Sequence, residues 1–347
     1  MASHLDSVKD YYGKVLQSKQ DLKTTACCSA ESMPEHLRTI AAQIHPEVLA
    51  RFYGCGVPIP AALEGLTVLD LGCGTGRDCF ILSKLVGERG QVIGVDMTDE
   101  QLALARTHQQ YHAEKFGLPR SNVSFRQGYI EDLKALDISD ASIDLVVSNC
   151  VFNLSPDKER LYREVLRVLK PGGEIYFSDV FCDRRLSSEA RTDPVLLGEC
   201  LGGAMYVEDF RRLMGHLGVH DVRAIKSSPV DVRSDTLHEK VNGARFSSIT
   251  MRVFKLELED RCEDYGQVAY YRGGITECPT AFELDDHHLF VKDKPMLVCS
   301  NTAAMVTESR FGRFFEVIGD TSQHFGLFDC APSASAGADK ASGGGCC

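Results

Sequence analysis

The sequence is short of positive charge: its 347 residues contain 38 Lys and Arg against 49 Asp and Glu, which gives a net charge of −11. A field of that sign repels nucleic acids and anionic membrane surfaces, so neither is expected as a partner. No apolar run approaches the roughly 20 residues that cross a bilayer. The first ten residues lack the basic-then-apolar pattern of a signal peptide. We therefore expect a cytoplasmic protein without a membrane partner.

The sequence also lacks any C-x-x-C pair, although it contains 14 cysteines. Cysteines at that spacing are typical of zinc fingers and ribbons, so their absence disfavours a zinc site of that kind. In a reducing compartment the cysteines should be thiols rather than a disulfide framework. Most of them are expected to be buried and structural, because buried thiols are common.

A third absence concerns the glycines that follow the apolar run Val68–Leu71. The nicotinamide fingerprint has glycines at its first, third and sixth positions, and the sixth position counted from Gly72 is Arg77. The apolar run predicts a buried parallel strand, and the residues after the loop carry a helical apolar stripe. Strand, glycine loop and helix together predict the ligand crevice of a doubly wound α/β sheet. An ordinary tight turn is the alternative.

The remaining sequence alternates predicted strands and helices up to about residue 259. Strands are predicted at 91–96, 123–127, 143–148, 174–181, 219–226 and 245–257, and helices at 4–18, 35–51, 99–116, 157–169 and 207–217. This pattern predicts a Rossmann-like, seven-stranded doubly wound sheet over residues 61–259, preceded by a helical cover over 1–60. A smaller α+β domain is expected over 260–330. The Ala/Ser/Gly-rich tail 331–347 is predicted to be disordered.

Three cysteines lie in segments that this topology brings to one edge of the sheet. Cys55 lies in a turn before the first strand, Cys150 follows the fourth strand, and Cys200 lies in a polar insert after the fifth. Each one alone is better explained as a buried structural cysteine. Together they fit a site for a thiophilic ion, and Cys27 can join them. Trivalent arsenic suits three thiolates, and its lone pair can attack a methyl carbon without a general base.

The sequence resembles the arsenite S-adenosylmethionine methyltransferase family. The similar segments are G-C-G at 54–56, D-L-G-C-G-T-G-R-D-C at 70–79, D-M at 96–97, S-N-C-V at 148–151, G-E-C-L-G-G-A at 198–204, R-F-x-S at 245–248 and Y-R-G-G-I-T at 271–276. The resemblance implies a class I methyltransferase fold, S-adenosylmethionine as cofactor, and a reverse-paired last strand. It also implies an As(III) site on Cys55, Cys150 and Cys200, with Cys27 in binding or redox relay.

The resemblance further implies which residues contact the cofactor. These are Tyr53, Asp70, Gly72, Gly74, Gly76, Arg77, Asp96, Met97, Ile130, Glu131, Asn149 and Val151. The spacing independently supports Asp96, which lies 20 residues beyond Gly76, near the place where a strand-end acid binds ribose hydroxyls. For Glu131, a helix-capping carboxylate is the alternative.

The expected reaction is transfer of methyl groups to As(III), delivered as a thiol conjugate, to give mono- and dimethylated arsenicals in arsenic detoxification. Each transfer formally oxidises arsenic, so a thiol reductant such as thioredoxin or glutathione is implied, with transient disulfides among the site cysteines. A monomer is expected. The alternatives are a methyltransferase for an organic carbon or oxygen acceptor, a thiol-rich metalloid-binding protein without catalysis, and structural zinc on the same cysteines.

Overall fold

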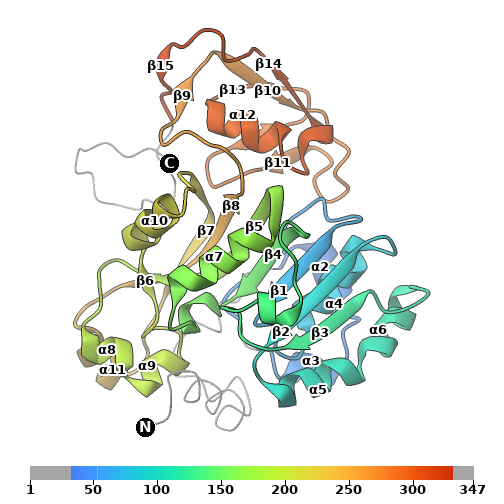
Figure 1. Ribbon diagram of the computed structural model, residues 1–347, viewed down its shortest axis with the longest axis vertical. Coiled ribbons are helices and arrows are strands. Elements are labelled where there is room, and N and C mark those ends of the chain that lie inside the picture. The colour runs from blue at the N-terminus through green and yellow to red at the C-terminus, as the bar shows by residue number, and fades with distance from the viewer. Residues whose placement is uncertain (1–32, 53, 331–347) are drawn as a thin grey trace.

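The computed structural model of the protein describes residues 33–52 and 54–330 (Figure 1). The predictions for the leader helix, Cys27, Tyr53 and the tail therefore lie outside the described residues. The central sheet has eight strands, in the order β3-β2-β1-β4-β5-β8-β7, and β6 pairs with β5 off this path. The strands are β1 (Thr67–Leu71), β2 (Gln91–Asp96), β3 (Val123–Gln127), β4 (Ile143–Asn149), β5 (Leu169–Cys182), β6 (Met205–Tyr206), β7 (Val222–Val230) and β8 (Phe246–Phe254).

The sheet is mixed, as the family resemblance implies. Strands β1 to β5 pair in parallel, whereas β8 runs antiparallel to both of its neighbours, β5 and β7. In register, Leu71 of β1 lies beside Ser148 of β4. The carboxyl ends of these central strands therefore meet at one edge, next to the glycine loop. The two-residue β6 raises the count above the predicted seven strands.

Helices cover both faces of the sheet (Figure 1). They are α2 (Glu35–Ala41), α3 (Pro46–Ala50), α4 (Arg77–Val86), α5 (Asp99–Thr107), α6 (Gln109–Phe116), α7 (Lys158–Val168), α8 (Ser188–Thr192), α9 (Pro194–Gly198), α10 (Val207–His216), α11 (Asp235–Val241) and α12 (Ser300–Thr307), with short 3₁₀ turns η3 (Lys134–Leu136), η4 (Phe152–Leu154) and η5 (Gly312–Phe314). Alternation along β1 sends Val68 into the core with α2 and α4, and Leu69 into the core with α7 and α10.

Two predicted helices are interrupted. The helix predicted over 35–51 is two helices, because Pro46 lacks a backbone N–H and starts α3 after the cap residue His45. The helix predicted over 99–116 breaks at His108, which leaves helical geometry and places its imidazole 3.0 Å from Glu47 of α3. The strand predicted to start at 174 instead begins at Leu169, which pairs with Ile143.

Beyond β8 the chain forms a smaller unit, with an antiparallel sheet in the order β13-β10-β14 and α12 beside it. Its strands are β9 (Glu263–Asp264), β10 (Gln267–Tyr271), β11 (Ala281–Glu283), β12 (Leu289–Val291), β13 (Pro295–Val298), β14 (Phe315–Ile318) and β15 (Gly326–Leu327). Aromatic side chains such as Tyr271, Phe282 and Phe311 form its core with Phe254 of β8. The α+β character matches the prediction, and the domain boundaries remain a prediction.

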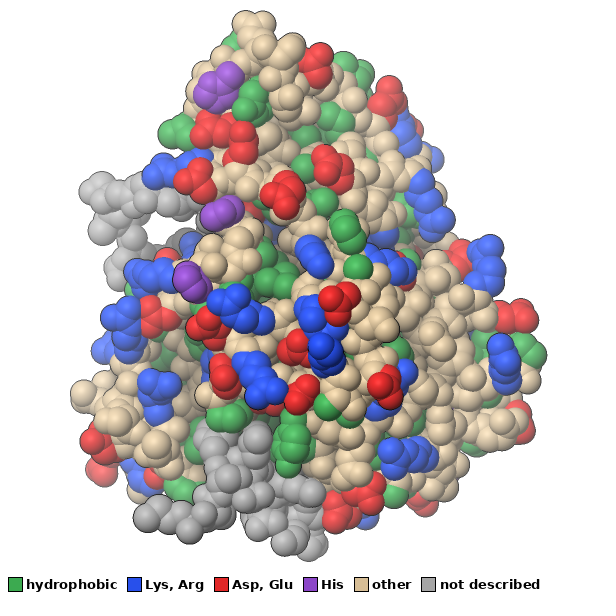
Figure 2. All heavy atoms as spheres, viewed as in Figure 1, with side chains coloured by type: hydrophobic (Ala, Val, Ile, Leu, Met, Phe, Trp, Pro, Cys, Tyr) green, Lys and Arg blue, Asp and Glu red, His purple; other side chains and the backbone are tan. Residues whose placement is uncertain are grey.

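Acidic and basic side chains are interspersed on the face drawn in Figure 2 rather than gathered into a basic field. Among the surface ion pairs, Arg160 pairs with Asp132, and Arg163 pairs with Glu159 one helical turn away on α7. Exposed pairs of this kind contribute little to stability. No helix among residues 33–52 and 54–330 is long and apolar enough to cross a membrane.

Candidate active site

The conformation of the glycine loop between β1 and α4 depends on a glycine with a positive φ angle and on hydrogen bonds to Asp96. Gly72 has a φ of 74°, and the Val151 side chain occupies the space where a Cβ would point. Asp96, at the end of β2, accepts hydrogen bonds from the backbone N–H groups of Gly74 (2.9 Å) and Thr98 (2.8 Å). The predicted ribose-binding acid therefore also fixes the loop.

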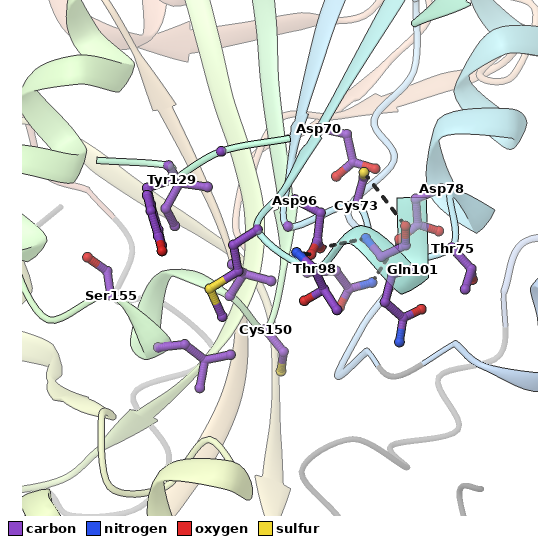
Figure 3. Close-up of a pocket in the computed structure, with 18 of the residues that line it drawn as sticks. Asp70, Cys73, Thr75, Asp78, Asp96, Thr98, Gln101, Tyr129, Cys150 and Ser155 are labelled. Atoms are coloured by element: carbon purple, nitrogen blue, oxygen red, sulfur yellow. Dashed lines mark hydrogen bonds between the residues drawn. The ribbon is translucent and has the colours of Figure 1, made fainter. Parts of the chain in front are cut away.

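A single cavity opens at this loop (Figure 3). It is lined by ten of the predicted residues: Asp70, Gly72, Gly74, Asp96, Met97, Ile130, Glu131, Asn149, Cys150 and Val151. Other lining residues lie outside the predicted contacts: Arg51, Phe52, Cys73, Thr75, Asp78, Thr98, Gln101, Gly128, Tyr129, Leu154 and Ser155. Cys73, Thr98, Gly128 and Tyr129 lie within two residues of the ends of β1, β2 and β3, which is a sequence signal that could have identified them. Arg51 and Phe52 precede β1, and Asp78 and Gln101 lie within α4 and α5, so their places in the cavity depend on the tertiary fold.

Gly76 and Arg77 do not line the cavity. A Cβ on Gly76 would lie 2.9 Å from the Phe125 ring, so this glycine allows α4 to pack closely. The Arg77 guanidinium pairs with Asp78 (2.6 Å) and lies 3.2 Å from the centre of the Phe52 ring. Both residues contact side chains around the glycine loop, and their cofactor contacts remain predictions.

Asn149 at the end of β4 joins two elements that border the cavity. Its Oδ1 accepts hydrogen bonds from the backbone N–H groups of Cys55 (2.9 Å) and Gly56 (3.1 Å). Its Nδ2 donates to the Gly56 carbonyl (2.9 Å) and to Asp78 (3.0 Å) on α4. This residue, predicted only as a cofactor contact, thus fixes the Cys55 segment to the glycine-loop helix.

The structure brings the cysteines at 55, 150 and 200 together from three distant segments. Cys55 and Cys150 form a disulfide, and the Cys200 sulfur lies 3.5 Å from the Cys150 carbonyl oxygen. All three side chains are buried in one apolar cluster. The expectation of thiols is wrong for Cys55 and Cys150, and also for Cys262, which is disulfide-bonded. The expectation that disulfides form among the site cysteines agrees with the first of these bonds.

Two of these cysteines have a backbone conformation that is rare for residues other than glycine. The φ angle is 59° at Cys150 and 60° at Cys200, in the left-handed region that costs L residues roughly 1–2 kcal/mol. Such conformations persist where the surrounding structure enforces them, and they are concentrated at functional sites. Figure 3 shows Cys150 between the Asp70–Asp96 side of the cavity and the side formed by Tyr129 and Ser155.

Comparison with known proteins identifies the family. A model described as a methyltransferase domain matches residues 62–218, and one described as the arsenite methyltransferase C-terminal domain matches residues 264–347. An arsenite methyltransferase from Aquipseudomonas alcaligenes is 55% identical over 325 residues, which cover 93% of each chain. The chain belongs to the arsenite methyltransferase family.

Other arsenite methyltransferases support this membership. The Homo sapiens arsenite methyltransferase is 42% identical over 312 residues, which cover 89% of this chain and 82% of the human one. The crystal structure of an arsenic(III) S-adenosylmethionine methyltransferase from Chlamydomonas reinhardtii aligns with a TM-score of 0.83 at 51% identity, over 86% of this chain and all of that one. Family membership confirms the predicted fold, the enzyme class and S-adenosylmethionine as methyl donor.

Asp70 gives the cavity at the glycine loop of this arsenite methyltransferase its electrostatic character. Burial, followed by repulsion from nearby Asp78, raises the pKa of Asp70 to about 8. The Cys79 thiol donates a hydrogen bond to the Asp70 carboxylate (3.1 Å). A cationic group of a bound ligand would favour the ionised form.

Glu131 also lines the cavity and is buried. The Ser155 hydroxyl donates a hydrogen bond of 2.5 Å to its Oε1. Among the described contacts, Glu131 accepts no bond from a helix N-terminus, so the geometry does not favour the capping alternative. The side chain therefore stays available to a ligand in the cavity.

The glycines beside the arsenite methyltransferase's cysteines allow close approach rather than left-handed turns. A Cβ on Gly54 would lie 2.8 Å from the Asn149 amide, and one on Gly56 would lie 2.5 Å from the Ser178 hydroxyl oxygen. Near Cys200, a Cβ on Gly202 would lie 3.0 Å from the Leu197 nitrogen. Because these glycines have no Cβ, the Cys55 and Cys200 segments can lie against the neighbouring parts of the site.

Proposed function

We propose that the protein holds As(III) on the sulfurs of Cys55, Cys150 and Cys200 and transfers methyl groups to it from S-adenosylmethionine. The observation that carries the proposal is the convergence of these three buried sulfurs, one of which, on Cys150, lines the cavity of the glycine loop. Soft thiolates prefer thiophilic ions. Mono- and then dimethylated arsenicals are the proposed products, in a detoxification reaction.

The residues around the cavity have distinct tasks in this proposal. Asp70 holds the amino group of the donor, and Asp96 holds its ribose while it fixes the glycine loop. Asn149 keeps Cys55 at the edge of the donor cavity through its four hydrogen bonds. Bound S-adenosylmethionine supplies an electrophilic methyl carbon, and the arsenic lone pair is the nucleophile. Positioning the two reactants supplies much of the acceleration.

Arsenic enters by thiol exchange, in which three cysteine thiols replace three thiols of an arsenic conjugate. The Cys55–Cys150 disulfide must open first, which consumes two thiols of a reductant and leaves that reductant as a disulfide. The bond therefore supports the expected thiol reductant, thioredoxin or glutathione. We further propose a monomer that works in the cytoplasm, where such reductants keep thiols available.

Arsenic speciation after incubation with donor, thiol and arsenite tests the proposal. Cys→Ser variants at 55, 150 and 200 should each lose methylation by at least about 100-fold, because each removes one ligand. Cys182→Ser is the matched control, since Cys182 lies in the same apolar cluster and is not a proposed ligand. Full activity of the three variants would overturn the arsenic site. Tight As(III) binding without methyl transfer by the wild-type protein would indicate a metalloid-binding protein instead.

A further inference from the structure

A second group of three cysteines lies in the C-terminal part of the chain, away from the donor cavity. The sulfurs of Cys262, Cys299 and Cys330 lie within 4.8 Å of one another. Their side chains are 4%, 0% and 7% exposed, and Phe328 packs against them. None of the three lines the donor cavity. This C-terminal thiol cluster is therefore distinct from the site of Cys55, Cys150 and Cys200.

Three separate segments form the C-terminal thiol cluster. Cys262 precedes β9 and Cys330 follows β15, and these strands share only the pairs Glu263–Leu327 and Asp264–Gly326. The Phe328 backbone N–H donates to the Cys262 carbonyl (2.8 Å) and extends this ribbon. So short a ribbon can open locally at small cost, which gives an ion a path to buried sulfurs.

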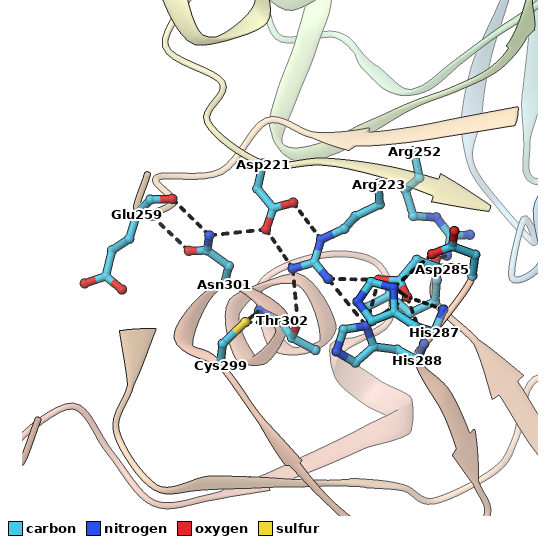
Figure 4. Close-up of polar contacts among 12 residues, drawn as sticks. Asp221, Arg223, Arg252, Glu259, Asp285, His287, His288, Cys299, Asn301 and Thr302 are labelled. Carbon is cyan, nitrogen blue, oxygen red and sulfur yellow. Dashed lines mark hydrogen bonds and ion pairs between the residues drawn. The ribbon is translucent and has the colours of Figure 1, made fainter. Parts of the chain in front are cut away.

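Cys299 is held by α12 and by a buried ionic network (Figure 4). It is the N-cap residue of α12, and its sulfur accepts from the Thr302 backbone N–H (3.5 Å) and lies 3.3 Å from the Thr302 hydroxyl. That hydroxyl accepts a bond from Arg223 of β7 (3.2 Å). Arg223 in turn pairs with Asp221 (2.6 Å) and Asp285 (2.9 Å). The Cys299 sulfur is therefore held in place by α12, whereas the positions of the Cys262 and Cys330 sulfurs depend on the pairing of β9 with β15.

We propose that the reduced C-terminal thiol cluster is a second As(III) site, which stores substrate away from the methyl donor. Cys262 is disulfide-bonded in the structure, so a dithiol reductant must first convert that bond to two thiols and become a disulfide itself. Arsenous acid then reacts with the three thiols. Three As–S bonds replace three As–O bonds, and three water molecules leave without a change in oxidation state.

The ligand set favours arsenic over zinc. Structural zinc takes four ligands, whereas the ligating group at this place within residues 33–52 and 54–330 consists of three cysteines, with no histidine or carboxylate among those residues. Three thiolates around Zn²⁺ would leave a net negative charge in an apolar, buried cluster, which is costly. Three thiolates around As(III) form a neutral, three-coordinate complex that needs no further ligand.

The test measures arsenic bound to the full-length protein after reduction, incubation with arsenite and gel filtration. In a Cys200→Ser background, which disables the first site, Cys299→Ser should lower bound arsenic by about one atom per chain. Cys278→Ser is the matched control from the same domain and should change nothing. Arsenic X-ray absorption of the Cys200→Ser protein should show three sulfur neighbours, and Cys299→Ser should remove that signature.

Cys330→Ser provides a second, independent variant if Cys299→Ser does not fold. Unchanged arsenic content in both variants would overturn the second site, as would a cluster that takes up zinc and excludes arsenite. Cys299→Ser alone should methylate arsenite at the wild-type rate, because Cys299 lies outside the donor cavity. Failure of the proposed function would appear instead in the Cys200→Ser protein, so the two outcomes are distinguishable.

Discussion

Cys150 and Cys200 combine a buried thiol with a left-handed backbone, at φ angles of 59° and 60°. Sequence patterns do not reveal such conformations, since neither residue is glycine or asparagine. The surrounding contacts of β4 and α9 must hold both residues in place. The backbone conformation alone would favour glycine at these two positions. A requirement for the sulfur atom therefore explains better than core packing why cysteine is present there.

Replacement of Cys200 separates its backbone strain from its chemistry. Cys200→Gly should be at least as stable as Cys200→Ala, because glycine adopts a positive φ without strain. Elsewhere in folded structure glycine is typically less stable than alanine by about 0.5–1 kcal/mol. Urea unfolding of the two variants measures the difference, and both should lose arsenite methylation. A Gly variant less stable than the Ala variant would contradict the strain argument.

Asp70 should make the stability of the ligand-free protein depend on pH. Its pKa is about 8 in the fold, against 3.8 for an ordinary aspartate. Between these values the folded protein retains a proton that the unfolded chain has lost, so the free energy of unfolding falls as pH rises through this window. In Asp70→Asn the fall between pH 5 and pH 8 should be smaller. Urea unfolding at both pH values measures it.

Saturating S-adenosylmethionine provides the control for this prediction. A donor cation beside Asp70 would keep the carboxylate ionised in the fold, which removes the proton difference between folded and unfolded chains. The wild-type protein with donor should therefore show a shallower pH dependence than without it. Equal slopes in wild type and Asp70→Asn would show that Asp70 does not hold the extra proton.

At the scale of elements, the segment 54–56 depends on close approach to β4 and β5. Gly56→Ala would place a methyl group 2.5 Å from the Ser178 hydroxyl oxygen and 2.7 Å from its Cβ. We expect a loss of stability of about 1–3 kcal/mol and a loss of methylation, because Cys55 moves away from Cys150. Thermal unfolding and speciation measure both effects.

Gly215→Ala is the control for Gly56→Ala. Gly215 lies within α10, and apart from its chain neighbours and the nearby backbone of its own helix, no atom lies within 4 Å of a Cβ built on it. Alanine there should leave activity unchanged and raise stability by up to about 1 kcal/mol, since alanine favours helices. If both variants behave alike, the close approach at Gly56 has no special importance.

The elements around the donor cavity were predictable because their signals are local. Val68–Leu71 and Gly72 report a buried strand and a tight loop within a few residues of sequence. The convergence of Cys55, Cys150 and Cys200 followed from strand order, which places the carboxyl ends of parallel strands at one edge. The two-residue β6 and the break at His108 carried no comparable signal, because tertiary contacts decide them.

Other features of the site were not predictable from the sequence, because they depend on the approach of distant side chains. Through its four hydrogen bonds, Asn149 connects Cys55 and Gly56, which lie 94 and 93 positions before it in the sequence, to Asp78 of α4. The pairing of Arg223 with Asp285 spans 62 positions. No periodicity encodes such contacts. The resemblance to a family identified Asn149 as important, and the geometry shows what this side chain does.

At the scale of the whole molecule, buried ion pairs attach the C-terminal part to the central sheet. Arg223 of β7 pairs with Asp285, and Arg252 of β8 pairs with Glu174 of β5 while it donates to the Leu284 carbonyl. The Asp286 backbone N–H also donates a hydrogen bond to the carbonyl oxygen of Ala224 in β7 (2.9 Å). We therefore expect the two parts to unfold together.

Arg223→Met should destabilise the protein by roughly 3–5 kcal/mol, because it removes the guanidinium that neutralises the buried carboxylates of Asp221 and Asp285. Arg160→Met is the control: its pair with Asp132 is half exposed, so less than about 1 kcal/mol is expected. Calorimetry of the wild type should show one transition. Two separated transitions in the wild type would contradict joint unfolding.

The bond between Cys55 and Cys150 connects positions 95 residues apart and occupies both sulfurs. A sample oxidised in air would then be folded but inactive. Its thermal unfolding curve would be that of a folded protein, and alkylating reagents would label neither Cys55 nor Cys150. No methyl group would be transferred. A short treatment with dithiol would restore turnover without refolding. Oxidative stress in a cell would pause arsenic processing in the same reversible way, while the enzyme itself is preserved.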